Sequence, residues 1–490
     1  MSNYPQITFC SGVGTVTGAN FLLETGESKV LIDCGMIQGE KFAMEENSRP
    51  FPYDVNSIDA LIITHAHLDH VGRIPKLVKE GYSGPIYSTS ETKALAEIVL
   101  NDAVGILHIN ARQEGVDPIY GADDVARVFP LWKTINYHED FKVTDDISIF
   151  LKDAGHILGS AMVEVSVIPT KTAIQGEIMK LNAGGNTPDS RRSLFSTPIK
   201  GENNRELKIL FTGDLGNSPS PLLRDTESVG EVDYIIMESV YGDRNHETRD
   251  ERLRQFEKII KDSIARGGTL IIPAFSIDRT QTLLYELNGL VEQKLIPSVP
   301  VFVDSPMAIK ATQIYQSGTA LFNDYVRGQI QKGDNVFDFP HLEYTVSQNE
   351  SHDIGRLMGS KIILAGSGMS VGGRVISHEE YYLPDAKNTI LLVGYQTLGS
   401  LGRQLADGAR KVNIHGNKIN IKARIETLYG YSAHKDSDHL VEFVSTATNR
   451  LKQIFVVMGE PGASMHLAQR INDELGKKAL VPEREVKYGL

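Results

Sequence analysis

The residues of this chain with the clearest capacity for chemistry lie at positions 65–70, which read HAHLDH. The apolar run at 59–64 predicts a buried strand before them, and residues 71–77 predict the start of a helix after them. Three of the chain's 14 histidines therefore share one turn with a carboxylate. Imidazole and carboxylate are ligands that zinc and similar metals prefer. We expect His65 and His67 to reach one ion, and Asp69 and His70 to reach a second.

Three further residues, each near the end of a predicted strand, supply what a two-metal centre needs. Asp33 ends the run LID, where its carboxylate can accept a hydrogen bond from a ligand histidine and fix its tautomer. His156 lies between glycines in DAGHILGS, which allow an imidazole to be presented on a tight turn. Asp214 closes the run ILFTGD, and its two oxygens can bridge two cations.

The elements that must position these side chains are short strands alternating with amphipathic helices. Paired strands are predicted at 16–24 and 28–33, joined by a turn, and strand character returns from 147 to 167. In the second half, continuous apolar strands separated by helices indicate a sheet covered on both faces. The strands expected there lie at 269–273, 301–304, 361–365 and 389–393, with a helix at 280–295. Residues 183–204 are rich in Gly, Asn, Ser and Pro and predict a long surface loop.

Composition sets the broad class. At 490 residues the chain is too long for one compact core. No uninterrupted apolar stretch reaches about 20 residues, and the N-terminus lacks a signal-peptide pattern, so we expect no membrane span and a cytoplasmic location. The two cysteines, Cys10 and Cys34, suit a reducing compartment. The net charge of −12 argues against a protein that coats nucleic acid but permits a local basic groove.

In their order along the chain, these metal-binding candidates resemble the metallo-β-lactamase superfamily. The resemblance rests on seven residues: Asp33, His65, His67, Asp69, His70, His156 and Asp214. It implies two zinc ions per chain. The first would be held by His65, His67 and His156, the second by Asp69 and His70, and Asp214 would bridge them. The superfamily hydrolyses many kinds of substrate, so the metal motif alone names none.

The segments after Asp214 resemble one branch of that superfamily, the β-CASP nucleases of RNA processing. The matching motifs are MESVYGDR at 237–244, PAFS at 273–276 with Arg279, DSPMA at 304–308, GSGM at 366–369 with GGR at 372–374, GYQ at 394–396 with GSLGR at 399–403, and YSAH at 431–434. The resemblance implies an α/β fold, an αββα metallo-β-lactamase sandwich with an inserted Rossmann-like β-CASP domain. The expected ranges are 1–225 for the first part of the sandwich, 226–411 for the β-CASP domain and 412–490 for the rest of the sandwich.

One position departs from the branch pattern. The branch commonly has a ligand histidine in a Val-His-Gly-Glu stretch near the C-terminus, and here residues 456–460 read VVMGE. Met458 therefore stands at that place, and a thioether is a poor zinc ligand compared with imidazole. We expect a weaker second metal site. His466 is not expected to substitute, because it falls on the helix that follows.

The resemblance implies a zinc-dependent ribonuclease. Hydroxide activated by two metals would attack a phosphodiester of single-stranded RNA and leave a 5′-phosphate and a 3′-hydroxyl. Asp69, His434 and Glu238 are the expected catalytic residues. His434 would be the proton donor, and Glu238 would orient its ring or favour its protonated form. Glycine-rich turns favour bound phosphate. The substrate contacts expected at or near such turns and in the YSAH motif are Ser367, Arg374, Arg403 and Ser432.

Two other functions are kept as alternatives: a metallohydrolase of a small ester or thioester, and a non-catalytic RNA-binding scaffold. The preference for RNA over DNA, the endonucleolytic or exonucleolytic mode, and the formation of a homodimer are left open by the sequence.

Overall fold

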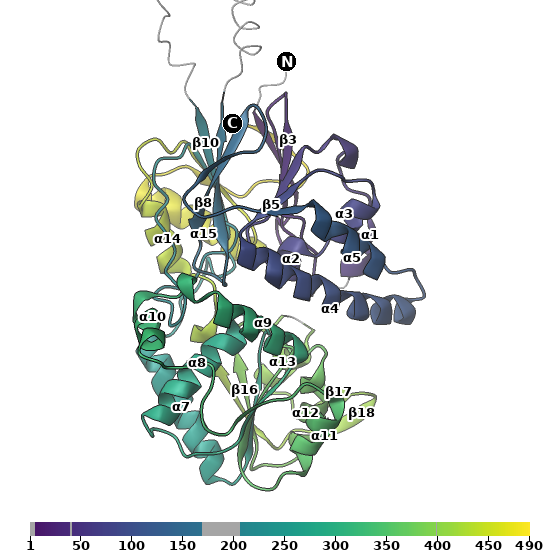
Figure 1. Cartoon of the computed structure of the whole chain (residues 1–490), viewed down its shortest axis with the longest axis vertical. Helices are drawn as coiled ribbons and strands as arrows, with labels where there is room; N and C mark the ends of the chain where they lie inside the picture. The colour runs from purple at the N-terminus through teal and green to yellow at the C-terminus, as the bar shows by residue number, and fades with distance from the viewer. Residues whose placement is uncertain (1–4, 40–41, 169–205, 398) are drawn as a thin grey trace, which may run out of the picture.

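The computed structural model describes residues 5–39, 42–168, 206–397 and 399–490. The loop expected at 183–204 lies outside these ranges. The described chain forms an upper body that contains both termini and a lower body below it (Figure 1).

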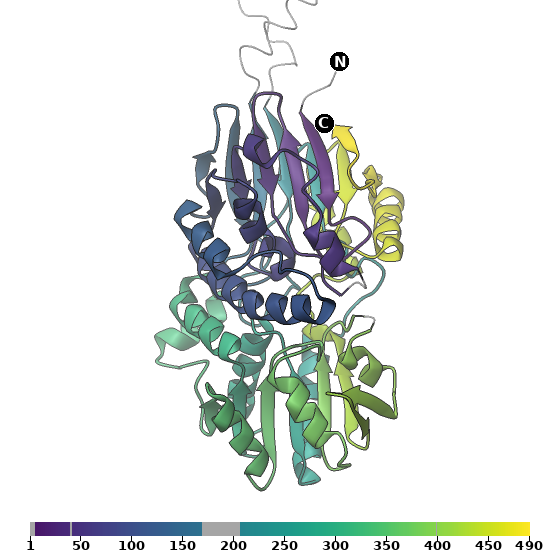
Figure 2. The ribbon, with the colours of Figure 1, turned by 90° about the vertical axis from the view of Figure 1, so that its right-hand side faces the viewer.

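Two seven-stranded sheets face each other in the upper body (Figures 1 and 2). In order across the first sheet lie β22 (Lys487–Gly489), β1 (Gln6–Ser11), β2 (Asn20–Glu24), β3 (Lys29–Ile32), β4 (Ala60–Ile62), β5 (Ile86–Ser88) and β6 (Trp132–Thr134). Across the second lie β21 (Ala479–Leu480), β20 (Gln453–Val456), β11 (Tyr234–Met237), β10 (Leu207–Phe211), β9 (Ala161–Val167), β8 (Ile147–Asp153) and β7 (Asp140–Lys142).

Apolar side chains from both sheets form the core between them. Phe9 and Phe21 of the first sheet and Phe211 and Phe455 of the second belong to this cluster, and all four are buried. The expected pairing of the strands around the 25–27 turn is confirmed, with Glu24 opposite Lys29 in an antiparallel ladder.

Helices cover the outer face of each sheet. Beside the first sheet lie α1 (Ala43–Ser48), α2 (Leu68–Val71), α3 (Ile74–Lys79), α4 (Ser90–Glu114) and α5 (Ala122–Val128), and beside the second lie α14 (Ser437–Ser445) and α15 (Pro461–Leu475) (Figure 1). This is the expected αββα sandwich.

The lower body is built on a six-stranded parallel sheet. Its order is β14 (Leu342–Tyr344), β13 (Val301–Asp304), β15 (Lys361–Ala365), β12 (Thr269–Pro273), β16 (Thr389–Val393) and β19 (Arg424–Leu428). Its helices are α7 (Arg249–Ala265), α8 (Arg279–Glu292), α9 (Pro306–Ser317), α10 (Asp324–Gln331), α11 (Gln348–Arg356), α12 (Arg374–Tyr382) and α13 (Leu401–Ala406), and β17 (Lys411–Ile414) and β18 (Asn417–Asn420) form a separate hairpin. A parallel sheet with intervening helices agrees with the Rossmann-like expectation.

The domain boundaries indicated by strand pairing differ from the expected ones. Strand β11 (Tyr234–Met237) pairs with β10 and β20 in the sandwich, although it falls inside the range expected for the β-CASP domain. Strand β19 (Arg424–Leu428) pairs with β16 of the lower sheet, although it falls in the range expected for the sandwich. Both are short strands whose sheet is determined by distant partners, which local sequence does not identify.

One helix among the described residues is long and apolar enough to cross a membrane by length and composition, namely Ser90–Arg112 within α4, with a mean hydropathy of 1.3. Charged residues interrupt this segment, so it is not an uninterrupted apolar stretch of about 20 residues. In this structure α4 packs against α2, α5 and α9, and Leu95, Leu100 and Leu107 are buried in a core.

Candidate metal centre

The HAHLDH turn leaves the end of β4 and enters α2, as the sequence predicts, with His67 as the N-cap of that helix. Asp33, just after β3, holds the turn in place. Its carboxylate accepts hydrogen bonds from the backbone N–H of Thr64 at 2.8 Å and the Thr64 hydroxyl at 2.8 Å, and Oδ2 lies 2.7 Å from Nδ1 of His70. An Nδ1–H···Oδ2 bond leaves Nε2 of His70 as a lone-pair donor facing the site.

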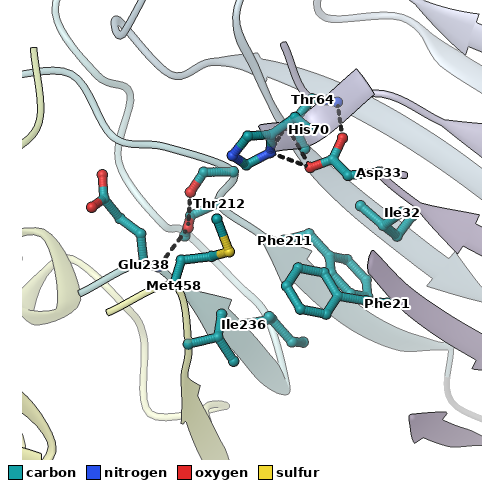
Figure 3. A pocket seen from close by; sticks show the side chains of 12 residues that line it. Phe21, Ile32, Asp33, Thr64, His70, Phe211, Thr212, Ile236, Glu238 and Met458 are labelled. Atoms are coloured by element: carbon teal, nitrogen blue, oxygen red, sulfur yellow. Dashed lines mark hydrogen bonds and ion pairs between the residues drawn. The ribbon is translucent and has the colours of Figure 1, made fainter. Parts of the chain in front are cut away.

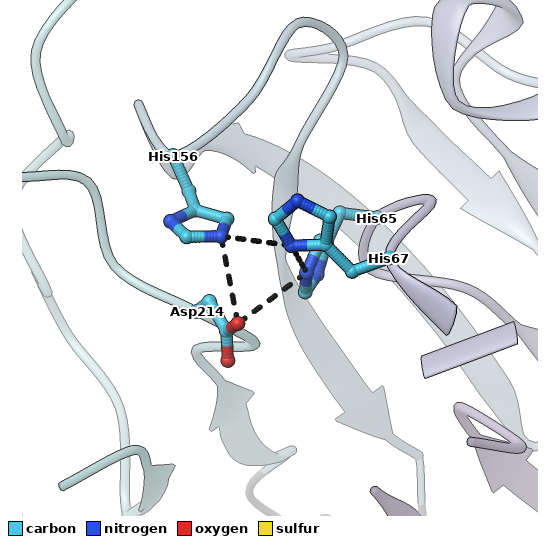
Figure 4. A group of neighbouring side chains, drawn as sticks. All are labelled: His65, His67, His156 and Asp214. Carbon is cyan, nitrogen blue, oxygen red and sulfur yellow. Dashed lines mark hydrogen bonds and ion pairs between the residues drawn. The ribbon is translucent and has the colours of Figure 1, made fainter. Parts of the chain in front are cut away.

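Three imidazole nitrogens and one carboxylate oxygen converge on the first candidate position (Figure 4). Nδ1 of His67 lies 3.1 Å from Nε2 of His65 and 3.2 Å from Nε2 of His156. Oδ2 of Asp214 lies 3.4 Å from Nε2 of His65 and 3.5 Å from Nε2 of His156. Nδ1 of His156 is 3.2 Å from the carbonyl oxygen of Ala433, which fixes the tautomer with a free Nε2.

The surroundings of two of these rings, His67 and His156, favour neutral imidazole, the form that ligates a cation. Burial lowers the pKa of His67 and that of His156 well below the ordinary value, and the neighbouring histidines lower both further. Neutral rings whose lone pairs face one point would repel each other without a cation between them, so this donor set fits zinc.

The second candidate position is formed by Asp69, His70 and Asp214. Nε2 of His70 lies 3.3 Å from Oδ1 of Asp214 and 3.8 Å from Oδ2 of Asp69. Nε2 of His70 and Oδ1 of Asp214 are both buried, and neither has a hydrogen-bond partner among the described residues. Buried polar atoms are normally satisfied, so these two orphaned atoms fit a cation bound between them.

His434 and Glu238 form a third group beside Asp214. Glu238 follows β11 and His434 follows a short 3-10 turn at Tyr429–Tyr431, so segments 196 residues apart meet. Nδ1 of His434 lies 3.0 Å and 3.2 Å from the two carboxylate oxygens of Glu238, and 4.0 Å from Oδ2 of Asp214. Burial opposes the charged imidazolium, but the two carboxylates outweigh it and raise the pKa of His434 to about 9.

Met458 lies next to this centre but belongs to the apolar core. It lines a small cavity with His70 and Glu238, while its thioether points toward the rings of Phe21 and Phe211 (Figure 3). A methionine there supplies no strong ligand to the second position. His466 lies on α15, as expected, and its Nδ1 is 3.0 Å from the carbonyl oxygen of Gly242.

The expected substrate contacts fall into two groups. Ser432 is buried beside the centre, and its hydroxyl accepts a hydrogen bond from the N–H of His434 at 3.3 Å. The others lie on loops and helices of the lower body. Arg374 is bonded to Asp304 at 2.6 Å and to the carbonyl oxygens of Thr345 and Val346.

The two remaining expected contacts are also engaged locally. The hydroxyl of Ser367 accepts from the N–H of Val371 at 3.1 Å, and Nε of Arg403 lies 2.9 Å from Asp407 on α13. The structure therefore brings Ser432, but not these engaged arginine side chains, into the group around His434.

Sequence reasoning did not single out two residues that support the centre. The hydroxyl of Thr64 links Asp33 to the histidine turn, and its place directly before His65 was the available signal. Nε2 of His246 lies 3.2 Å from the carbonyl oxygen of His434, which braces that loop. No local spacing indicated this contact, because the two residues are 188 positions apart.

Comparison with known proteins agrees with this architecture. Family models match residues 22–172 as a metallo-beta-lactamase superfamily domain, 280–405 as a Beta-Casp domain, and 418–482 as a Zn-dependent metallo-hydrolase RNA specificity domain. A crystal structure of a protein of unknown function from Enterococcus faecalis V583 shares the fold, with a TM-score of 0.54 and 12% identity over 99% of this chain and 100% of that one.

Curated relatives cover most of the chain. Ribonuclease TTHA0252 of Thermus thermophilus is 34% identical over 88% of this chain and 88% of its own length. Transcription termination factor FttA of Methanosarcina mazei and that of Thermococcus kodakarensis are each 30% identical, over 96% and 98% of this chain and 69% and 70% of their own lengths. With this similarity, and with the sandwich, the inserted parallel sheet and the histidine–carboxylate cluster in place, the chain belongs to the β-CASP branch of the metallo-β-lactamase superfamily and is a metal-dependent hydrolase.

Proposed function

We propose that this protein is a zinc-dependent ribonuclease that hydrolyses phosphodiester bonds of single-stranded RNA and leaves a 5′-phosphate and a 3′-hydroxyl. The observation that carries the proposal is the His434–Glu238 pair, 3.0 Å apart, directly beside the two groups able to hold cations. The name of the Thermus thermophilus relative, a ribonuclease, supports RNA as the substrate.

The metal-binding part of the proposal is two zinc ions per chain. His65, His67 and His156 would hold the first, Asp69 and His70 the second, and Asp214 would contact both. When bound, such ions lower the pKa of water and neutralise charge on a phosphoryl group. Because Met458 supplies no imidazole, the second ion is held more weakly than the first.

The chain's own residues account for orientation and proton transfer. Asp33 fixes the ring of His70 through Nδ1, and the carbonyl oxygen of Ala433 does the same for His156. Glu238 holds His434 in its protonated form near neutral pH, as the raised pKa indicates. That imidazolium donates its proton to the departing 3′ oxygen, which a leaving alkoxide requires.

The cellular part of the proposal is a cytoplasmic location, supported by two free, buried cysteines, Cys10 and Cys34.

The testing experiment measures cleavage of an end-labelled single-stranded RNA, and of a thioester, by chelator-treated protein before and after zinc or manganese is added. We expect metal-dependent RNA cleavage and little thioester hydrolysis. His434→Ala should lower turnover by about 10²-fold or more with bound metal unchanged. The matched control is His415→Ala, which removes a histidine that is 57% exposed and paired with Glu380.

Each contrary result has a distinct meaning. Thioester hydrolysis without RNA cleavage would make the protein a small-ester hydrolase. RNA binding without any hydrolysis would make it a scaffold. Loss of metal in His434→Ala would make His434 a ligand instead of the proton donor.

A further inference from the structure

A polar pocket lies behind the metal centre, where the two bodies of the protein meet. The sandwich contributes Gly155, His156 and the segment 217–221, the lower body contributes residues from α7 and α8, and the 431–433 loop closes it. Pro219 at its rim is exposed, so the pocket opens to solvent. His156 and Ala433 line this pocket and also bound the metal centre, so the pocket and the metal centre share a wall.

Arg279 lines the pocket and forms no ion pair, although the carboxyl of Asp278 in the same pocket acts on its charge. Its side chain is 7% exposed, and it forms no hydrogen bond or ion pair with any described residue. Its Nε–H is buried and has no hydrogen-bond partner among the described residues, and a buried N–H without a hydrogen bond costs free energy. The arginines of the two glycine-rich motifs, Arg374 and Arg403, are in contrast bonded to Asp304 and Asp407.

The neighbouring guanidinium does not compete for an anion. Arg252 also lines the pocket, but it is paired with Glu286, which accepts a hydrogen bond from Tyr431 as well. One N–H group of Arg252 donates to the carbonyl oxygen of Gly430 at 2.9 Å. Its charge is therefore compensated, and Arg279 is left to meet a ligand.

Other donors around Arg279 are also available. The oxygen of Ser220 accepts from the backbone N–H of Leu223 at 3.0 Å, so its own hydrogen remains free to be donated. The hydroxyl of Thr282 has no hydrogen-bond partner among the described residues. Helix α8 begins at Arg279, so the positive end of its dipole lies at the same place.

The backbone is bent to place Arg279 there. Asp278 adopts φ 66° and ψ −54°, and the N–H of Arg279 donates to the carbonyl oxygen of Ile277 at 2.9 Å. This is a γ-turn of the rare positive-φ type, a strained geometry that occurs mostly where function requires it. The carboxyl of Asp278 also lines the pocket, and it opposes a bound anion.

We propose that this pocket binds a phosphate group of the RNA strand next to the scissile one, with Arg279 as its principal contact. The inference rests on the proposed ribonuclease function for the source of the phosphate. The chemistry recognised is a phosphoryl oxygen, so inorganic phosphate should compete for the same place.

The test measures the affinity of the full-length, metal-loaded protein for a labelled single-stranded RNA, in a His434→Ala background in which cleavage is slow relative to binding. Arg279→Gln should weaken binding about tenfold or more, because a charge-assisted hydrogen bond to phosphate is lost. The slope of log affinity against log salt should fall by about 0.7, the value for one phosphate contact on a single strand. Arg356→Gln is the matched control, since Arg356 is an exposed arginine on α11 paired with Asp353.

Inorganic phosphate supplies the second arm. It should displace RNA from the background protein less effectively after Arg279→Gln, and more effectively after Asp278→Asn, which removes the opposing charge. Folding is checked by bound metal and by thermal unfolding. If Arg279→Gln fails to fold, the Asp278→Asn variant tests the proposal instead. Phosphate competition that is unchanged in the Asp278→Asn protein would overturn the proposal.

An unchanged RNA affinity and salt slope in a folded Arg279→Gln protein would also overturn it. These outcomes are separate from failure of the ribonuclease itself. If the native protein neither binds nor cleaves RNA but phosphate binding still follows the two substitutions, the pocket is a phosphate site and the proposed function is wrong.

Discussion

Replacing Glu238 by Gln is the most informative perturbation of the proton donor. The substitution keeps the size of the side chain and removes one negative charge at 3.0 Å from Nδ1 of His434. In the proposed mechanism, that charge keeps His434 protonated near neutral pH. Burial of His434 remains after the substitution, and burial alone favours the neutral ring.

The expected size of the effect follows from the pKa of His434, which is raised from 6.5 to about 9 mainly by Glu238 against the effect of burial. Without Glu238 the value should return to about 6.5 or below. At pH 8 the protonated fraction of His434 would then fall from about nine-tenths to a few hundredths, a loss of about thirtyfold in rate. At pH 6 the protonated fraction would fall only to about three-quarters, a loss of about 1.3-fold.

The assay is the single-turnover rate of RNA cleavage from pH 5.5 to 9.5, with bound metal measured at each pH. The native profile should fall on its basic side near pH 9, and that fall should move to about pH 7 or lower in Glu238→Gln. Glu380→Gln, which changes a carboxylate on α12 paired with the exposed His415, is the control and should leave the profile unchanged. An unmoved basic limb in a Glu238→Gln protein that retains its metal would refute the role of Glu238.

Three further predictions follow from the same structure. Met458→His should strengthen binding of the second metal at least tenfold in a chelator competition, because imidazole replaces a thioether beside His70; equally tight binding of two ions by the native protein would contradict this. Asp33→Asn should weaken metal binding about 10- to 100-fold by releasing Nδ1 of His70, and unchanged affinity would show that Asp33 does not orient the ring. Burial raises the pKa of Glu379 to about 7, so its contribution to stability is complete below about pH 4.5 and is lost as pH rises through 7. Glu379→Gln replaces this carboxyl by an amide that does not titrate. The decrease in the free energy of unfolding from pH 5 to pH 8, measured by urea unfolding, should therefore become smaller by about 3 kcal/mol at most. An unchanged decrease would contradict the raised pKa.

Local patterns were sufficient to predict the parts of the centre that lie on one turn or at a strand end. The 65–70 turn could be recognised because four ligand-type side chains fall within six residues. The apolar runs at 269–273, 361–365 and 389–393 could be recognised as buried strands, and all three are central strands of the parallel sheet.

Features that depend on contacts between distant segments were not predictable in the same way. The sheet to which β11 and β19 belong is set by strands far away in sequence, so the expected boundaries did not follow strand pairing. The bonding of Arg374 to Asp304, 70 residues away, equally left no local pattern. Arg279 looks like the other motif arginines in sequence, and only the fold shows that it lacks a partner.

Cleavage of single-stranded RNA in water enriched with oxygen-18 tests the central claim most directly. Mass spectrometry of the products would locate the oxygen that comes from solvent. We expect one labelled oxygen on the 5′-phosphate of the downstream fragment and none on the 3′-hydroxyl of the upstream fragment, with no reaction after the metal is removed. A 2′,3′-cyclic phosphate, a labelled 3′-phosphate, or cleavage that persists without metal would contradict it.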